Sequence, residues 1–146
     1  MIEPEVNAIP TGSAAYRGPM SLSFTPVAAT TVNLEGTLGV TVDFDATIDA
    51  ITGDVSEFET NAGGPVEGRL FLSGGTLDNN NSQLLMSSQL SGSLQSAGNG
   101  FLIFGQMTGE FDGDGQSAMI GSVAGTARQA GVDSTLTGDF LAIRLP

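Results

Sequence analysis

The side chains of this sequence that are able to do chemistry are mainly carboxylates. There are 16 aspartates and glutamates against four basic residues, and all four are arginines. A long run of acids lies between Arg17 and Arg69 with no basic residue among them. Several of these acids alternate with apolar residues, so they are expected to face solvent together. This candidate acidic patch consists of Glu35, Asp43, Asp45 and Asp49.

The acidic patch has two interpretations. Clustered carboxylates provide a docking surface for a basic partner, or ligands for divalent cations. The same residues also describe a solvated, mutually repulsive surface whose effect is to keep the protein soluble. Both interpretations remain open on the sequence, which has a net charge of −12.

The sequence lacks the side chains that most catalytic and cofactor chemistry requires. Histidine and cysteine are absent and so is lysine, so no base is available to activate a serine or threonine. A pair of catalytic carboxylates needs one acid in an apolar pocket, whereas the alternation sends the strand acids to water. Haem would have only Tyr16 or a methionine as axial ligand, and three of the methionines are expected in the core. The sequence therefore predicts a protein that is not an enzyme and has no cofactor.

Two loops that resemble sites are better explained as turns. Asp112-Gly113-Asp114-Gly115 supplies only two of the oxygen ligands that a calcium loop needs, so it predicts a hairpin turn. Asp78-Asn79-Asn80-Asn81 is likewise expected to be a solvated loop.

Charge and hydropathy also limit the partners. Nucleic-acid binding needs a basic surface, and this chain has none, so no nucleic acid is expected. No apolar run approaches the ~20 residues of a membrane-spanning helix, and Met1 is not followed by a signal-peptide pattern. A lipid anchor in a longer precursor, on a cysteine before Ile2, stays open. We expect the partner to be a protein.

Period-two alternation of apolar residues dominates the chain, as in strands with one buried face. The clearest case runs from Val32 to Ile48, with apolar even positions and polar odd ones, and Gly36 is a point where the alternation can shift. The expected strands lie near residues 16–24, 32–46, 48–58, 66–74, 83–95, 100–111, 117–128 and 134–145. Long strands joined by short turns favour an all-β fold, an eight-stranded antiparallel up-and-down β-barrel, over a β-sandwich.

The barrel is expected to span residues 16–146, after an extended N-terminal arm or tether at 1–15 that contains two prolines. Phe111 and Phe140 each follow a glycine by two residues, Gly109 and Gly138. Each ring is therefore expected to be a core anchor that covers bare backbone on a neighbouring strand.

The second half of the chain resembles a known family. Residues 105–125 comprise a strand ending in Gly-x-Phe, a turn of small polar residues and a strand with the spacing Gly-x-x-x-Gly. Residues 137–144 (TGDFLAIR) follow, and the earlier Val42-Asp43-Phe44 and Ile51-Thr52-Gly53 fit the same pattern. This order is similar to the C-terminal barrel of transferrin-binding protein B and related bacterial surface lipoproteins, including the factor H-binding proteins.

The resemblance covers roughly residues 32–145 and implies an exported, non-enzymatic binding module, extracellular or at the bacterial outer-membrane surface. The family members bind different partners, so no binding residue is carried over. Two alternatives remain: a lipocalin-like carrier of a small apolar ligand, and a surface structural subunit that self-assembles through the arm.

Overall fold

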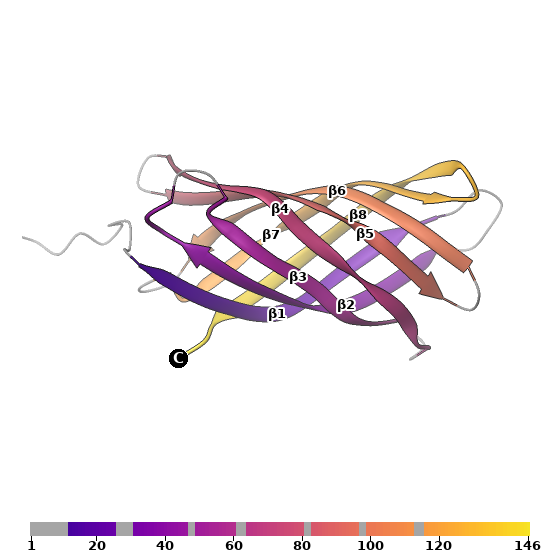
Figure 1. Cartoon of the computed structure of the whole chain (residues 1–146), viewed down its shortest axis with the longest axis horizontal. Helices are drawn as coiled ribbons and strands as arrows, with labels where there is room; N and C mark the ends of the chain where they lie inside the picture. The colour runs from indigo at the N-terminus through magenta and orange to yellow at the C-terminus, as the bar shows by residue number, and fades with distance from the viewer. Residues whose placement is uncertain are drawn as a thin grey trace, which may run out of the picture.

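The computed structural model describes residues 12–25, 31–46, 49–60, 64–80, 83–96, 99–112 and 116–146. These residues form eight antiparallel strands that close into one elongated barrel (Figure 1). The strands are β1 (Ser13–Phe24), β2 (Val32–Asp43), β3 (Ile51–Thr60), β4 (Val66–Asn80), β5 (Gln83–Ser96), β6 (Asn99–Asp112), β7 (Ala118–Gln129) and β8 (Val132–Arg144). Among the described residues, no helix is long and apolar enough to cross a lipid bilayer.

The order of the strands around the barrel is their order in the sequence. Each strand pairs with the next, and β8 returns to pair with β1 from Tyr16↔Arg144 to Phe24↔Leu136. Closure gives every strand a partner on both sides, which distinguishes this arrangement from a two-sheet sandwich. The predicted eight-stranded up-and-down barrel is therefore confirmed.

The alternation on β2 also holds. Leu34, Leu38, Val40, Val42 and Phe44 are buried, and the odd positions between Val32 and Phe44 are exposed or half-buried; Ile48 lies outside the described residues. Gly36 does not shift this pattern. The irregularity lies on β3 instead, where one extra residue sits between the pairs Glu35↔Glu59 and Thr37↔Ser56, and Glu57 has a φ of 57°.

The boundaries of β4 and of the arm differ from the prediction. β4 does not end at residue 74. A bulge there places one extra residue on β4 between Ser73 and Thr76, and Gly74 adopts the φ of 62° that the bulge requires. The strand then continues to Asn80, so Asp78–Asn80 pair with β5 and are not a loop. The predicted arm is shorter than expected, since Ser13–Ala15 belong to β1; residues 1–11 lie outside the described residues.

Inward-facing glycines make room for large side chains in the core. The ring of Phe140 lies over Gly109 and Gly121, where a Cβ would approach its Cζ atom to 3.0 and 2.8 Å. The ring of Phe58 covers Gly36 in the same way, with Cδ1 2.7 Å from a Cβ built there. The expected role of Phe140 as an anchor over bare backbone is therefore confirmed.

Aromatic contacts occupy both ends of the core. Phe111 is buried, as expected, and packs edge-on against Tyr16 and Phe44, with ring centroids 5.6 and 5.7 Å apart. Towards the other end, Phe24 and Phe101 make a similar contact at 4.9 Å. Such edge-to-face pairs add about 0.5–1.5 kcal/mol beyond the burial of their area.

Tyr16 is the single tyrosine of the chain and ties distant segments together. Its buried ring lies on β1, and its hydroxyl donates a hydrogen bond of 2.6 Å to the carbonyl oxygen of Gln116, which precedes β7. Burial raises the pKa of the Tyr16 phenol above its ordinary value of 10.0, and the positive charge of Arg144 offsets part of the rise.

The alkaline stability of the protein is expected to depend on Tyr16 more than on any other side chain, because there is no lysine or cysteine to titrate with it. Above pH 10 the phenol of the unfolded chain loses its proton while the folded phenol keeps it, since the folded pKa is the higher one. The contribution of Tyr16 to the free energy of unfolding should therefore be fully present below pH 10 and be lost as the pH rises through the folded pKa. Urea denaturation at a series of pH values measures it.

The matched control is Tyr16→Phe, which keeps the ring and removes the ionisable hydroxyl. This variant should lose about 0.5–1.5 kcal/mol at neutral pH with its hydrogen bond, and should show no further loss above pH 10. An equally steep alkaline loss in the variant would show that another group is responsible.

Candidate functional site

The four predicted patch residues do not form one surface. Asp43 is the last residue of β2, Asp45 lies in the turn that follows, and Asp49 precedes β3. Glu35 lies eight residues before Asp43 on β2, which corresponds to about 26 Å at ~3.3 Å per residue. The four residues are therefore not one compact cluster, because β2 ends at Asp43 and the later acids belong to the connection.

The acids of this connection hold its backbone. A side-chain oxygen of Asp43 accepts a hydrogen bond of 3.0 Å from the amide of Asp45. A side-chain oxygen of Asp45 accepts one of 2.9 Å from the amide of Gly12. Bonds of this type are the usual reason for aspartate in turns, and they give Asp43 and Asp45 a structural role.

The acids at this end of the barrel include Asp78 and Asp112, which the sequence predicts only as loop or turn residues. In an up-and-down barrel the hairpins β2–β3, β4–β5 and β6–β7 all turn at the same end. Asp78 and Asp112 lie near the ends of β4 and β6 and so share that end with the β2–β3 connection. We call this set the acidic rim; it consists of Asp43, Asp45, Asp49, Asp78 and Asp112.

Glu35 instead belongs to a second group on the outer wall. It lies directly opposite Glu59 on β3 and opposite Ser21 on β1, and Ser21 in turn lies opposite Asp139 on β8. Strands in a sheet are ~4.8 Å apart, so these carboxylates follow one another around the barrel. We call Glu35, Glu59 and Asp139 the acidic wall.

A groove of about 670 Å³ runs along the acidic wall. Besides the three carboxylates, its polar lining consists of Ser21, Ser23, Asn33, Thr60 and Thr137. The sequence did not point to this site, because its members come together only through the closing pair of β8 with β1 and the bulge in β3. Alternation fixes which face a residue takes, but not its neighbours across the sheet.

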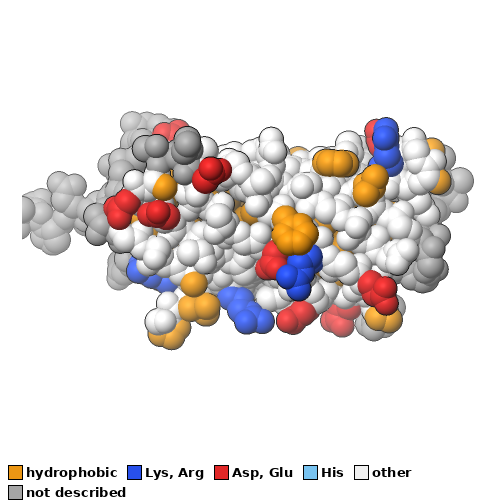
Figure 2. Space-filling view, viewed as in Figure 1, with side chains coloured by type: hydrophobic (Ala, Val, Ile, Leu, Met, Phe, Trp, Pro, Cys, Tyr) orange, Lys and Arg blue, Asp and Glu red, His pale blue; other side chains and the backbone are white. Residues whose placement is uncertain are grey.

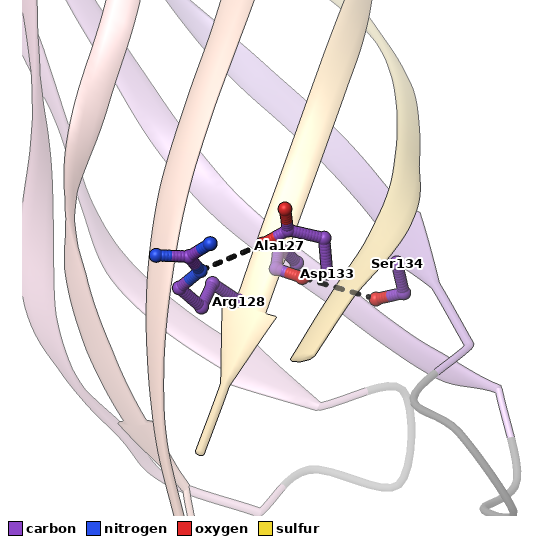
Figure 3. Close-up of polar contacts among 4 residues, drawn as sticks. All are labelled: Ala127, Arg128, Asp133 and Ser134. Atoms are coloured by element: carbon purple, nitrogen blue, oxygen red, sulfur yellow. Dashed lines mark hydrogen bonds and ion pairs between the residues drawn. The ribbon is translucent and has the colours of Figure 1, made fainter. Parts of the chain in front are cut away.

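The arginines leave the acidic wall uncompensated. Arg69 forms an ion pair of 3.0 Å with Asp54, and Arg17 lies 3.8 Å from Glu57. Figure 3 shows the third pair, in which Arg128 contacts Asp133 at 2.8 Å across the β7–β8 hairpin. Within the described ranges, no arginine forms an ion pair with any acid of the wall.

The chemistry available at the wall is electrostatic. Its exposed carboxylates and hydroxyls offer hydrogen-bond acceptors and negative potential to a cationic group such as guanidinium. In the part of the chain that the structure describes, no three acids are placed to hold a metal ion. The divalent-cation interpretation of the acids has no support from this geometry.

The sequence matches no protein-family model and no curated protein.

The placement of Glu35 opposite Glu59 is expected to lower the stability of the barrel. Like charges directly opposite on neighbouring strands repel, so Glu59→Gln should raise the free energy of unfolding by about 0.2–1 kcal/mol at low salt. The gain should shrink at high salt, because exposed charges are screened. Urea denaturation at two salt concentrations measures both effects.

Glu67→Gln is the matched control, since Glu67 is also exposed on a strand but lies opposite the neutral Gln95. Both variants remove one negative charge. Equal stabilisation by the two would attribute the effect to net charge and contradict a local repulsion.

Proposed function

We propose that this barrel is a non-enzymatic binding module that docks a positively charged protein on its outer wall. The acidic wall is the contact, and the rest of the barrel is the scaffold that holds it. The module works outside the cell or at a bacterial outer-membrane surface, as the resemblance to the transferrin-binding protein B barrels suggests.

The observation that carries the proposal is the uncompensated charge of the wall. Glu35, Glu59 and Asp139 line one groove, and no arginine of the described chain pairs with them. Holding like charges together is unfavourable for folding alone. The same arrangement favours a basic partner, because it speeds the encounter and matches the partner's charge.

Two further observations support binding over catalysis and over transport of a small molecule. The sequence has no histidine, cysteine or lysine, so nucleophile–base pairs of the usual kinds are not available. Inside the described core, the space next to Gly36 and Gly121 is taken by phenylalanine rings rather than left for a ligand. These features favour a partner on the outside of the barrel.

The test uses a fluorescein-labelled oligo-arginine peptide as the basic probe, with binding followed by fluorescence anisotropy. The affinity should fall steeply between low and physiological salt. The triple variant Glu35→Gln, Glu59→Gln, Asp139→Asn should weaken binding by about tenfold or more and also slow association.

The matched control is Asp43→Asn, Asp45→Asn, Asp49→Asn, which removes the same number of charges from the acidic rim. Asparagine keeps an acceptor oxygen, so the bonds to the amides of Gly12 and Asp45 can persist. This variant should bind within about threefold of the unaltered protein. Equal weakening by both variants, or binding that is insensitive to salt, would contradict docking at the wall.

A further inference from the structure

Two phenylalanine side chains stand exposed on the side of the barrel away from the acidic wall. Phe71 on β4 is 53% exposed and Phe104 on β6 is 56% exposed. Both lie directly opposite Ser91 on the intervening strand β5. Two strand spacings place their Cα atoms about 10 Å apart, on the same outward face.

Polar, uncharged side chains adjoin these rings. A groove of about 440 Å³ runs beside Phe104, and its polar lining comes from Gln89, Ser91 and Gln106. Gln89 and Gln106 lie directly opposite each other on β5 and β6. The amide nitrogen of Gln106 donates to the hydroxyl oxygen of Ser87 at 2.5 Å, which fixes the orientation of that side chain.

The arginines beside this face are each paired with an aspartate, while Glu67 and Glu110 lie four residues from Phe71 and Gln106 along β4 and β6. Arg69 pairs with Asp54, which lies opposite Phe71, and Arg128 pairs with Asp133 on the far side of β6. Figure 2 shows isolated hydrophobic side chains on a mostly white surface, with some blue and red side chains adjacent and other red ones standing alone towards both ends. In a protein with a net charge of −12, a locally neutral face is complementary to an uncharged ligand.

We propose that this face binds a neutral carbohydrate chain laid across β4, β5 and β6. The phenylalanine face consists of Phe71, Gln89, Ser91, Phe104 and Gln106. A pyranose ring has an apolar C–H surface that packs on an aromatic ring, and a rim of hydroxyls that both donate and accept hydrogen bonds. Amide side chains match that rim because each carries a donor and an acceptor.

The geometry of the phenylalanine face favours an extended carbohydrate ligand over a curled one. Phe71 and Phe104 lie on either side of Ser91, so their rings are positioned to contact alternate sugars of a straight glycan. Ser91, Gln89 and Gln106 then contact the sugar between the rings and its neighbours. The site is an open groove on the outer face, which accommodates an extended ligand with its remaining surface in solvent. This site is separate from the acidic wall and does not depend on the function proposed for it.

The test titrates the full chain with cellohexaose, a neutral and extended β-1,4-linked oligosaccharide, and follows backbone amide shifts by NMR. Binding should perturb the amides of Ser91, Phe104 and Gln106. Phe71→Ala and Phe104→Ala should each weaken binding by at least about tenfold. Maltohexaose, which has the same sugar in a curled α-1,4-linked chain, should bind more weakly.

Leu141→Ala is the control, since Leu141 is also an exposed apolar side chain but lies on β8 outside the phenylalanine face. It should leave binding unchanged. The thermal midpoints of all three variants should match the parent, because the side chains removed are exposed.

Three results would overturn the proposal. The first is the absence of any shift with cellohexaose at millimolar concentration. The second is binding that survives Phe71→Ala and Phe104→Ala. The third is a dimer, detected by sedimentation, that these two variants dissociate, since the face would then be an interface between copies of this chain.

Discussion

The structure depends on filling a narrow closed interior. Eight strands leave room for little more than their own side chains, so a ring at one inward position requires its neighbours to be small. Gly109 and Gly121 meet this requirement beneath Phe140, and Gly36 does so beneath Phe58. The closure of the barrel, and therefore the placing of every outward residue, depends on these contacts.

The inward face of the strands could be predicted from the sequence more fully than the outward face. Alternation on β2 correctly placed Val42 and Phe44 in the core, because burial of one face leaves a direct mark on the sequence. The sequence predicts that a strand ends at residue 74, whereas Gly74 and Gly75 form a bulge inside β4, since a glycine signal does not distinguish these two outcomes. The acidic wall was missed, because the register that joins Glu35 to Glu59 and Asp139 depends on a bulge and on closure rather than on local pattern.

A filled interior directs function to the outer surface, where the two halves of the barrel differ in chemistry. The side formed by β8, β1, β2 and β3 carries the acidic wall, and no ion pair joins an arginine of the described residues to the acids of that wall. The side formed by β4, β5 and β6 carries two exposed phenylalanines among uncharged side chains, and Arg69 on β4 is paired with Asp54. Both surfaces are built on rigid strands, so a ligand finds its contacts already in place.

The packing of the glycine-lined interior is tested most directly by the free energy of unfolding of Gly121→Ala, compared with Gly39→Ala. A Cβ at residue 121 would collide with the carbonyl oxygen of Thr108 and lie 2.8 Å from Phe140, whereas one at residue 39 would meet no atom closer than 3.9 Å. Gly121→Ala is predicted to lose at least about 1–3 kcal/mol through overpacking. Gly39→Ala, on the outer face of β2, is predicted to lose nothing and to gain up to about 1 kcal/mol. Equal stability of the two variants would contradict a tightly filled barrel and would favour an interior with room for a ligand.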